Sequence, residues 1–421
     1  MKTFTLFLLV ITLSISGFKA KSQTVIDVVT NSENHTTLEA AVDAAGLVET
    51  LSGDGPFTLF APTDAAFETL PEGTLEALLE NPGDNLKQIL LFHTVASEAY
   101  SNSLNDGMAV NTIQGQPLNV SITNNEVRIN NALVSVADIE AENGVVHVID
   151  AVLIPDNDVK VSHLDEVGSF LTDKEGNTLY YFTKDADGSS YCMGECLEIW
   201  PEFYTEGTFL PNSLHHDDFG TITREDGKMQ TTYKGWPLYY FANDNTSGDI
   251  NGEGINNVWY VANPEYTVML SDNQLIGNDD VLYQSDYTEG EEILKYITDA
   301  NGVTLYAFSK DFHNRNMFTA DDFSNNQMWP VYETEEVVAP SGVDENDFDI
   351  IDVHGKNQLT YKGWPLYYFG GDEMIRGNTK GVSVPAPGIW PVLTPSIQAA
   401  PDYTVVDVIV NSEAHSTLEA A

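Results

Sequence analysis

The chain has 421 residues, with 64 Asp and Glu against 18 Lys and Arg, which gives a formal net charge of −46. So acidic a surface argues against nucleic-acid binding, because phosphate affinity comes from Lys and Arg releasing counterions, and it argues equally against docking to anionic lipid headgroups. The hydrophobic content of 42% nevertheless supplies packed cores, so composition excludes a disordered chain.

Residues 1–22 have the features of a secretory signal peptide. Lys2 precedes an apolar run at 4–15, and small residues follow before Gln23. The run is shorter than the roughly 20 residues of a membrane-spanning helix, and no later stretch is long and apolar enough to span a bilayer. We therefore expect an exported protein, secreted or at the cell surface, in an oxidising compartment.

Residues 23–155 change from helical to strand-like patterns along the chain. Helices are predicted at 32–47, 75–79 and 85–92 from apolar residues at helical spacing. Strands are predicted at 57–60, 118–122, 126–129 and 144–154. Helices first and strands later predict an α+β domain.

Three stretches of this domain resemble the fasciclin domain. FTLFAPTDAAF at 57–67 and NGVVHVIDAVLIP at 143–155 resemble its two signature boxes, and LFHTV at 91–95 resembles its central His motif. The resemblance covers 23–155 and implies a compact wedge of β-strands flanked by helices. It also implies a secreted or surface protein associated with cell adhesion, whose partner is a cell-surface or matrix protein or a polysaccharide, and it implies no enzyme activity.

Phe92 and His93 are the candidate binding residues that the resemblance implies for this domain. The family often has a Tyr-His pair here that has been linked to adhesion, whereas this chain lacks the phenolic hydroxyl. The alternative is that His93 is partly buried and hydrogen-bonded to the backbone, and we expect His147 to be structural as well.

A duplicated module occupies the middle of the chain. Four segments share the pattern Tyr-x-Phe-x-x-Asp: Tyr180-Phe182-Asp185, Tyr239-Phe241-Asp244, Tyr306-Phe308-Asp311 and Tyr367-Phe369-Asp372. The tryptophans repeat with them: Trp200 with Trp329, Trp236 with Trp364, and Trp259 with Trp390. Equivalent motif tyrosines are 126 (306 − 180) or 128 (367 − 239) residues apart. We name the copies module A (164–270) and module B (291–395), and their strand–turn–strand patterns predict mostly β structure.

These modules resemble the secreted or lipoprotein repeat family that has a Tyr-x-(aromatic)-x-x-Asp motif. The matching pieces also include the Cys pair before Trp200 and the Gly-Trp-Pro turn at 235–237. The resemblance implies little about function. Since the motif Tyr and Phe share one face of an extended strand, we expect them to pack in the core, with the Asp in a turn.

Trp236 and Trp364 are the candidate binding residues of the modules because both sit at hairpin turns. Exposed aromatic rings stack on sugars, so a glycan-binding module array is the alternative function. The same residues also suit a β core, in which aromatic side chains are common.

Cys192 and Cys196 are separated by three residues that include a Gly suited to a tight turn. In an exported protein such a pair most simply forms a disulfide. A metal site with His215 and His216 and a redox protein using the two cysteines are the alternatives, whereas a haem site would need Cys-x-x-Cys-His. Counting back from Trp329, module B has Asn325 and Asp321 at the matching places.

An acidic, Gly-containing loop follows the second motif of module A. Its oxygen-bearing side chains are Asp244, Asp249, Asn251 and Glu253, a residue set that suits calcium. The place twelve residues into an EF-hand-type loop holds Tyr260 instead of Glu, and the corresponding loop of module B has lost its acids. A solvated turn without calcium is therefore the alternative, and no other cofactor is expected.

The segment 404–421 repeats 24–41 with 13 of 18 positions identical. A domain does not end within its first helix, so we expect 402–421 to be the truncated start of a second fasciclin-like domain in a fragment of a longer protein. The predicted fold is multidomain: an α+β fasciclin-like wedge and then two mostly-β modules. The predicted function is a non-enzymatic surface or matrix protein that mediates adhesion, with the modules as spacers or accessory binding units.

Overall fold

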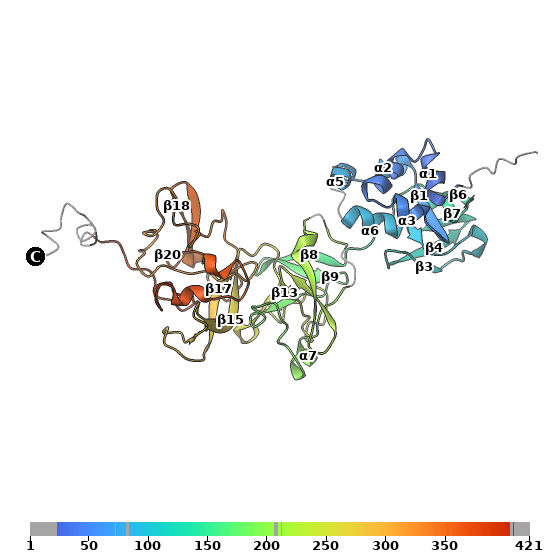
Figure 1. Ribbon diagram of the computed structural model, residues 1–421. Helices are drawn as coiled ribbons and strands as arrows, with labels where there is room; N and C mark the ends of the chain where they lie inside the picture. The colour runs from blue at the N-terminus through green and yellow to red at the C-terminus, as the bar shows by residue number, and fades with distance from the viewer. Residues whose placement is uncertain are drawn as a thin grey trace, which may run out of the picture. The chain divides into compact units, whose positions relative to one another are not determined.

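The computed structural model describes residues 23–71, 73–80, 84–205, 209–211, 213–404 and 407. The chain divides into two compact units, unit 1 (1–155) and unit 2 (156–421) (Figure 1). The predicted signal peptide lies outside the described residues, as does the repeated segment 404–421 apart from Thr404 and Asp407.

Unit 1 combines short helices with one sheet. Its helices are α1 (Val25–Thr30), α2 (Thr36–Ala44), α3 (Val48–Ser52), α4 (Asp64–Phe67), α5 (Thr74–Glu80), α6 (Asp84–Phe92) and the 3-10 turn η1 (Ser101–Ser103). Its strands are β1 (Phe57–Pro62), β2 (Thr94–Val95), β3 (Ala109–Asn111), β4 (Pro117–Thr123), β5 (Glu126–Ile129), β6 (Ala132–Ala141) and β7 (Gly144–Ile149). The described part of unit 1 is thus an α+β structure.

The helix predicted at 32–47 is shorter in the structure. A turn precedes α2, and Gly46 adopts a left-handed φ of +66° after it, so the helix spans only Thr36–Ala44. Thr24 is the N-cap of helix α1, and its side chain forms a capping box with that of Asp27. Thr404 and Asp407 make the same pair of side-chain bonds.

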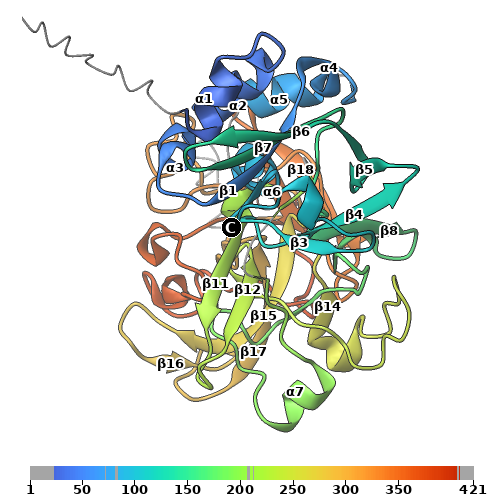
Figure 2. The ribbon, with the colours of Figure 1, turned by 90° about the vertical axis from the view of Figure 1, so that its right-hand side faces the viewer.

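The seven strands of unit 1 form one sheet in the order β2-β1-β7-β6-β5-β4-β3. β1 and β7 pair in parallel, and the other pairs are antiparallel. Every residue of β7 is buried, and helices α1 and α2 lie on the side of β6 and β7 away from β3 and β4 (Figure 2). The sequence did not predict β6, because two register shifts interrupt the alternation of buried and exposed residues along this strand. The strand predicted at 144–154 is shorter in the structure, where β7 ends at Ile149.

Unit 2 is rich in β structure. The strands up to the end of module A are β8 (Val159–Leu164), β9 (Gly168–Asp173), β10 (Tyr180–Phe182), β11 (Phe219–Thr223), β12 (Met229–Tyr233), β13 (Trp236–Pro237), β14 (Trp259–Val261) and β15 (Val268–Ile276). Those that follow are β16 (Leu282–Tyr283), β17 (Ile293–Asp299), β18 (Phe348–Val353), β19 (Lys356–Tyr361) and β20 (Trp364–Pro365). The helical segments are α7 (Glu195–Ile199), η2 (His216–Asp218), η3 (Ile255–Asn257), η4 (Glu345–Asp347), η5 (Gly370–Asp372) and η6 (Lys380–Ser383).

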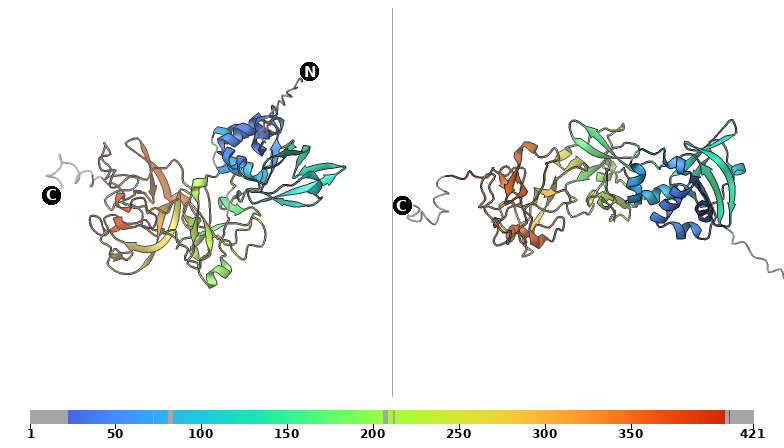
Figure 3. Two further views of the ribbon diagram at one scale, coloured as in Figure 1. Left: turned by 45° about the vertical axis from the view of Figure 1, so that its right-hand side comes forward. Right: turned by 90° about the horizontal axis from the view of Figure 1, so that it is seen from above.

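The two modules share a hydrophobic core. β15, which begins at the end of module A and continues past it, pairs antiparallel with β17 of module B from Val268 to Gln274. One cluster of buried residues includes Tyr181 and Trp236 from module A together with Leu305 and Leu366 from module B. Modules A and B therefore lie against each other within one compact unit (Figure 3).

Candidate functional site

The Tyr-x-Phe-x-x-Asp motifs of module A interlock in pairs. The hydroxyl of Tyr180 donates to Asp244 (2.8 Å), and the hydroxyl of Tyr239 donates to Asp185 (2.6 Å). The backbones of the two tyrosines also exchange hydrogen bonds of 2.8 and 2.9 Å. Each motif thus supplies the donor for the other motif's carboxylate, in a twofold-like arrangement.

Module B repeats this arrangement. The hydroxyl of Tyr306 donates to Asp372 (2.6 Å), and that of Tyr367 donates to Asp311 (2.7 Å). In both modules the second carboxylate oxygen accepts a backbone N–H from further along the chain. These bonds come from Tyr191 to Asp185, Asn251 to Asp244, Met317 to Asp311, and Lys380 to Asp372.

Burial dominates the electrostatics of these carboxylates. It raises the pKa of Asp185 and of Asp311 to about 7 and that of Asp372 to about 6, although hydrogen bonds from tyrosine and backbone partly oppose it. Burial also raises the pKa of the Tyr180 and Tyr239 hydroxyls, which keeps them protonated donors. The motif residues therefore form buried hydrogen-bonded pairs.

Stacked indoles lie beside each set of motif tyrosines. The ring centroids of Trp200 and Trp259 are 3.9 Å apart, and those of Trp329 and Trp390 are 3.7 Å apart. All four indoles are buried, which places them in the core of their modules.

Cys192 and Cys196 form a disulfide, as the sequence predicts. The loop that carries them is held by Arg224, whose side chain is fully buried and whose Nη2 donates to the carbonyl of Cys192 (2.7 Å). A second donation from Arg224 reaches the hydroxyl of Ser190, which in turn bonds Tyr239. A surface hollow of about 440 Å³ lies beside this loop and is lined partly by Arg224.

In module B an aromatic ring and an amide replace the disulfide. The loop is longer, with 17 residues between Asp311 and Trp329 against 14 between Asp185 and Trp200. Since Tyr191 and Met317 bond the motif aspartates in the same way, the residue equivalent to Cys192 is Phe318. The sequence count that placed Asp321 there is wrong because it ignored the insertion. Asn325 lies where predicted, and its amide donates to Phe318 O (2.6 Å).

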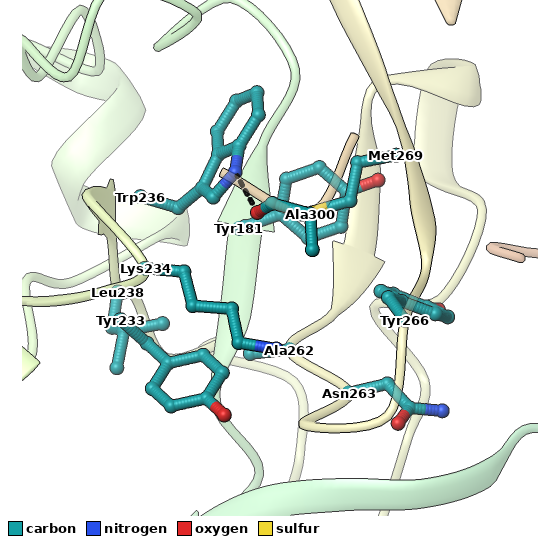
Figure 4. Close-up of a pocket in the computed structure, with 10 residues that line it drawn as sticks. All are labelled: Tyr181, Tyr233, Lys234, Trp236, Leu238, Ala262, Asn263, Tyr266, Met269 and Ala300. Atoms are coloured by element: carbon teal, nitrogen blue, oxygen red, sulfur yellow. Dashed lines mark hydrogen bonds between the residues drawn. The ribbon is translucent and has the colours of Figure 1, made fainter. Parts of the chain in front are cut away.

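Trp236 is buried where the two modules meet (Figure 4). Its Nε1 donates to Ala300 O (3.2 Å). The guanidinium carbon of Arg376 lies 4.5 Å from the centroid of the indole ring, and the centroid of the Tyr181 ring lies 5.1 Å from it. The cavity beside it has a volume of about 10 Å³, room for a single water molecule. Trp236 therefore offers no platform for a sugar ring, contrary to the binding role predicted for it.

Trp364 is half-buried, and its Nε1 donates to Gln398 O (2.8 Å). Its ring packs against the core that the two modules share. The segment that follows module B thus accepts the hydrogen bond of this indole. Trp364 is therefore less exposed than its predicted place at an open hairpin turn suggested.

Three of the four calcium candidates of module A, namely Asp244, Asp249 and Glu253, use their carboxylate oxygens within the chain. Asp244 accepts from Tyr180, Asp249 accepts from the backbone and hydroxyl of Thr246, and Glu253 accepts from Val261 N and from Ser341. Asn251 contributes its backbone N–H to Asp244. Within the described ranges no group of three or more His, Cys, Asp or Glu is arranged to hold a metal ion, and this includes His215 and His216.

Phe92 and His93 are both buried in unit 1. The His93 ring contacts Ile89 O at 2.8 Å through Nδ1 and accepts from Leu153 N at 2.9 Å through Nε2, so Nδ1 carries the proton. Burial lowers its pKa to about 4. The placement favours the structural alternative and leaves neither side chain accessible to a ligand.

His147 is also buried, and its ring stacks on Phe60 with centroids 5.5 Å apart. Its Nε2 donates to Ala99 O (2.9 Å), while Nδ1 accepts from Asp138 N (3.2 Å). It therefore joins three segments of unit 1.

Two arginines of unit 2, the buried Arg224 and the partly buried Arg376, were not singled out from the sequence. Arg224 holds the disulfide-bearing loop, and Arg376 of module B donates to Ala186 O (3.0 Å) and Lys234 O (3.2 Å) of module A. The only signal in the sequence was the small number of basic residues, 18 in the whole chain. A buried arginine needs partners for its charge, so the few arginines present were worth examining as structural residues.

Comparison with known protein families finds two kinds of domain. The profile described as "Fasciclin domain" matches residues 33–155. The profile described as "Secreted repeat of unknown function" matches 163–203, 220–263 and 350–394. The paired bonds of Tyr306 and Asp311 show that the first half of module B, which that profile leaves unmatched, completes the same arrangement.

Similar proteins match between about a quarter and a third of this chain. Protein sll1483 of Synechocystis is 44% identical over 136 residues, which cover 32% of this chain and 74% of that protein. The cell surface glycolipoprotein MPB83 of Mycobacterium bovis is 39% identical over 109 residues, covering 26% of this chain and 48% of that protein. A solved FAS1 domain pair from the insect cell adhesion molecule fasciclin I has 18% identity and a TM-score of 0.30, covering 32% of this chain and 51% of that one.

Proposed function

The chain belongs to the fasciclin-domain family, and from this membership we propose that it is an exported, non-enzymatic surface or matrix protein that mediates adhesion through unit 1. Unit 2 acts as a stiff spacer that carries unit 1. The supporting observation is the 39% identity over 109 residues between this chain and a protein described as a cell surface glycolipoprotein. The description of the unit 2 repeats as secreted supports the same location.

The construction of unit 2 supports the spacer role. Modules A and B share a buried core and are joined by Arg376, so bending between them would expose apolar surface and break the partly buried hydrogen bonds of Arg376. Among the described residues, none of the helices combines the length and apolar character needed to cross a bilayer.

The charge of unit 1 limits its partners. Residues 23–155 contain 2 basic and 19 acidic residues, a net charge of 2 − 19 = −17. A neutral or basic surface on a matrix protein or polysaccharide fits this charge, whereas a polyanion would be repelled. Since Phe92 and His93 are buried, adhesion must use other, exposed side chains of unit 1.

A bead assay tests the adhesive role. Beads carrying the chain from Gln23 onward should be retained on cell envelopes of the producing cells, and beads carrying only the chain from Asp156 onward should not be. The chain divides into two compact units, and each has a buried hydrophobic core, so each unit is expected to fold by itself. Equal retention of the two bead types would refute adhesion through unit 1.

Export is tested on the protein recovered outside the cell. Mass spectrometry of its N-terminal peptide should find Gln23 as the first residue. An intact Met1 on protein recovered outside the cell would refute the signal peptide.

A further inference from the structure

Two loops of module A, one at Ala186 and one at Lys234 to Trp236, offer polar groups to module B, and we call this contact site the slot of module A. Module B fills this slot. Arg376 donates to the carbonyls of Ala186 and Lys234, and Trp236 Nε1 donates to the carbonyl of Ala300. Polar groups at the edges of the slot are thus satisfied by the neighbouring module.

Module B has the equivalent slot, and the segment 396–403 fills it. We call this segment the strap. The bonds run from His313 N to Pro401 O (2.8 Å), from Ala400 N to Lys362 O (2.9 Å), and from Trp364 Nε1 to Gln398 O (2.8 Å). Lys362 and Trp364 are the counterparts of Lys234 and Trp236, each 128 residues further on (362 − 234; 364 − 236). The same lysine carbonyl and indole N–H therefore receive two different occupants in the two modules.

Three strap side chains at three-residue spacing anchor it to module B. Ile397 packs against the shared core, and Ala400 is buried. The ring of Tyr403 lies 3.8 Å from the guanidinium carbon of Arg315, and its centroid is 4.9 Å from that of Phe312. A cation and an aromatic edge thus clamp the end of the strap.

Apart from these contacts, module B covers little of the strap. It forms no strand with module B, and five of its eight residues are exposed. A short extended segment held by backbone bonds, one small buried side chain and one aromatic clamp has the features of a bound peptide.

We propose that the slot of module B is a peptide-binding site and that the strap is its built-in ligand. The site takes an extended segment that offers a carbonyl to Trp364, a small side chain at the position of Ala400 and an aromatic ring to Arg315. While the strap is bound, its Tyr403 lies against module B, one residue before Thr404, where the repeat of 24–41 begins.

The test opens the slot in the otherwise complete chain. Ala400→Asp places a charge at the buried anchor and should expel the strap. A fluorescently labelled peptide of residues 396–404 should then bind the variant at least tenfold more tightly than it binds the unchanged chain, as measured by fluorescence anisotropy. The same peptide with Tyr403→Ala is the matched control and should bind at least fivefold more weakly.

A second substitution assigns the binding to this slot. In the opened chain, Trp364→Phe removes the indole donor but keeps an aromatic ring, so peptide affinity should fall about fivefold, in line with the loss of one hydrogen bond. Unchanged affinity would place the peptide elsewhere and overturn the proposal.

Three further results would also overturn it. One is an opened chain that keeps its melting temperature but does not bind the peptide. Another is peptide that binds the unchanged chain and the opened chain with equal affinity. The third is a dimer of the unchanged chain in light scattering that Ala400→Asp abolishes, because the slot would then hold the strap of a second copy. If Ala400→Asp fails to fold, Tyr403→Ala in the full chain opens the slot more gently and should still increase peptide binding.

Discussion

The hydroxyl of Tyr239 donates a 2.6 Å hydrogen bond to the buried carboxylate of Asp185, which lies 54 residues earlier in the chain. Asp185 also closes the next loop by accepting from Tyr191 N (2.8 Å). The carboxylate therefore ties the two halves of module A together. Its position in the core makes module stability sensitive to its protonation.

Unit 2 should lose stability as the pH rises from about 4 to about 7. Burial raises the pKa of Asp185 and Asp311 to about 7 in the folded chain, above the ordinary value of 3.8. In this pH range the folded state retains protons that the unfolded state has lost, so the stabilisation is complete below pH 3.8 and disappears as the pH passes 7. All six tryptophans lie in unit 2, so thermal melts followed by Trp fluorescence report this unit alone.

The double variant Asp185→Asn and Asp311→Asn should flatten that pH dependence. Glu195→Gln, which removes an exposed charge, should leave the slope of melting temperature against pH unchanged and controls for general charge repulsion. A slope as steep in the double variant as in the parent would contradict the assignment to these two carboxylates.

Unit 1 should respond to pH in the opposite direction. Burial lowers the pKa of His93 to about 4, below the ordinary 6.5, so its contribution is present above pH 6.5 and is lost as the pH falls through 4. Protonation of Nε2 also removes the acceptor for Leu153 N. Hydrogen–deuterium exchange of peptides around 84–104 should therefore accelerate between pH 6 and pH 4, after correction for intrinsic rates. Unaltered protection across this range would count against the buried neutral histidine.

Removing one motif hydroxyl should destabilise unit 2. Tyr239→Phe leaves Asp185 without its side-chain donor and should lower the free energy of unfolding by about 1–3 kcal/mol in urea titrations followed by Trp fluorescence. Tyr367→Phe should do the same in module B, where Asp311 loses its donor. The exposed Tyr204 provides the control, and Tyr204→Phe should change the value by less than about 0.5 kcal/mol. Equal effects at buried and exposed positions would argue against the paired motif.

The sequence predicted about half of the elements of unit 1, the duplicated modules and the disulfide, because these depend on local pattern and spacing. It could not predict that Tyr239 reaches Asp185, since that contact depends on how two distant strands meet. Nor could it predict the burial of Trp236. A tryptophan at a hairpin turn looks exposed until Arg376 and Ala300 of the other module cover it. Phe318 was missed because an insertion displaced the simple count from Trp329.

The stability of module A should depend on its disulfide more than the stability of module B depends on Phe318 and Asn325, which occupy the matching places. Opening the short loop with the double variant Cys192→Ser and Cys196→Ser should lower the free energy of unfolding by about 2 kcal/mol, because the unfolded chain regains conformational freedom. In module B, Asn325→Ala removes the amide bonds to Phe318 O and from Ala320 N, which should lower it by about 1–2 kcal/mol. Reducing agent should destabilise the parent by as much as the Ser substitutions and leave the Asn325→Ala effect unchanged. A parent chain that is indifferent to reductant, with free thiols detected by alkylation and mass spectrometry, would show that the bond contributes nothing to module A.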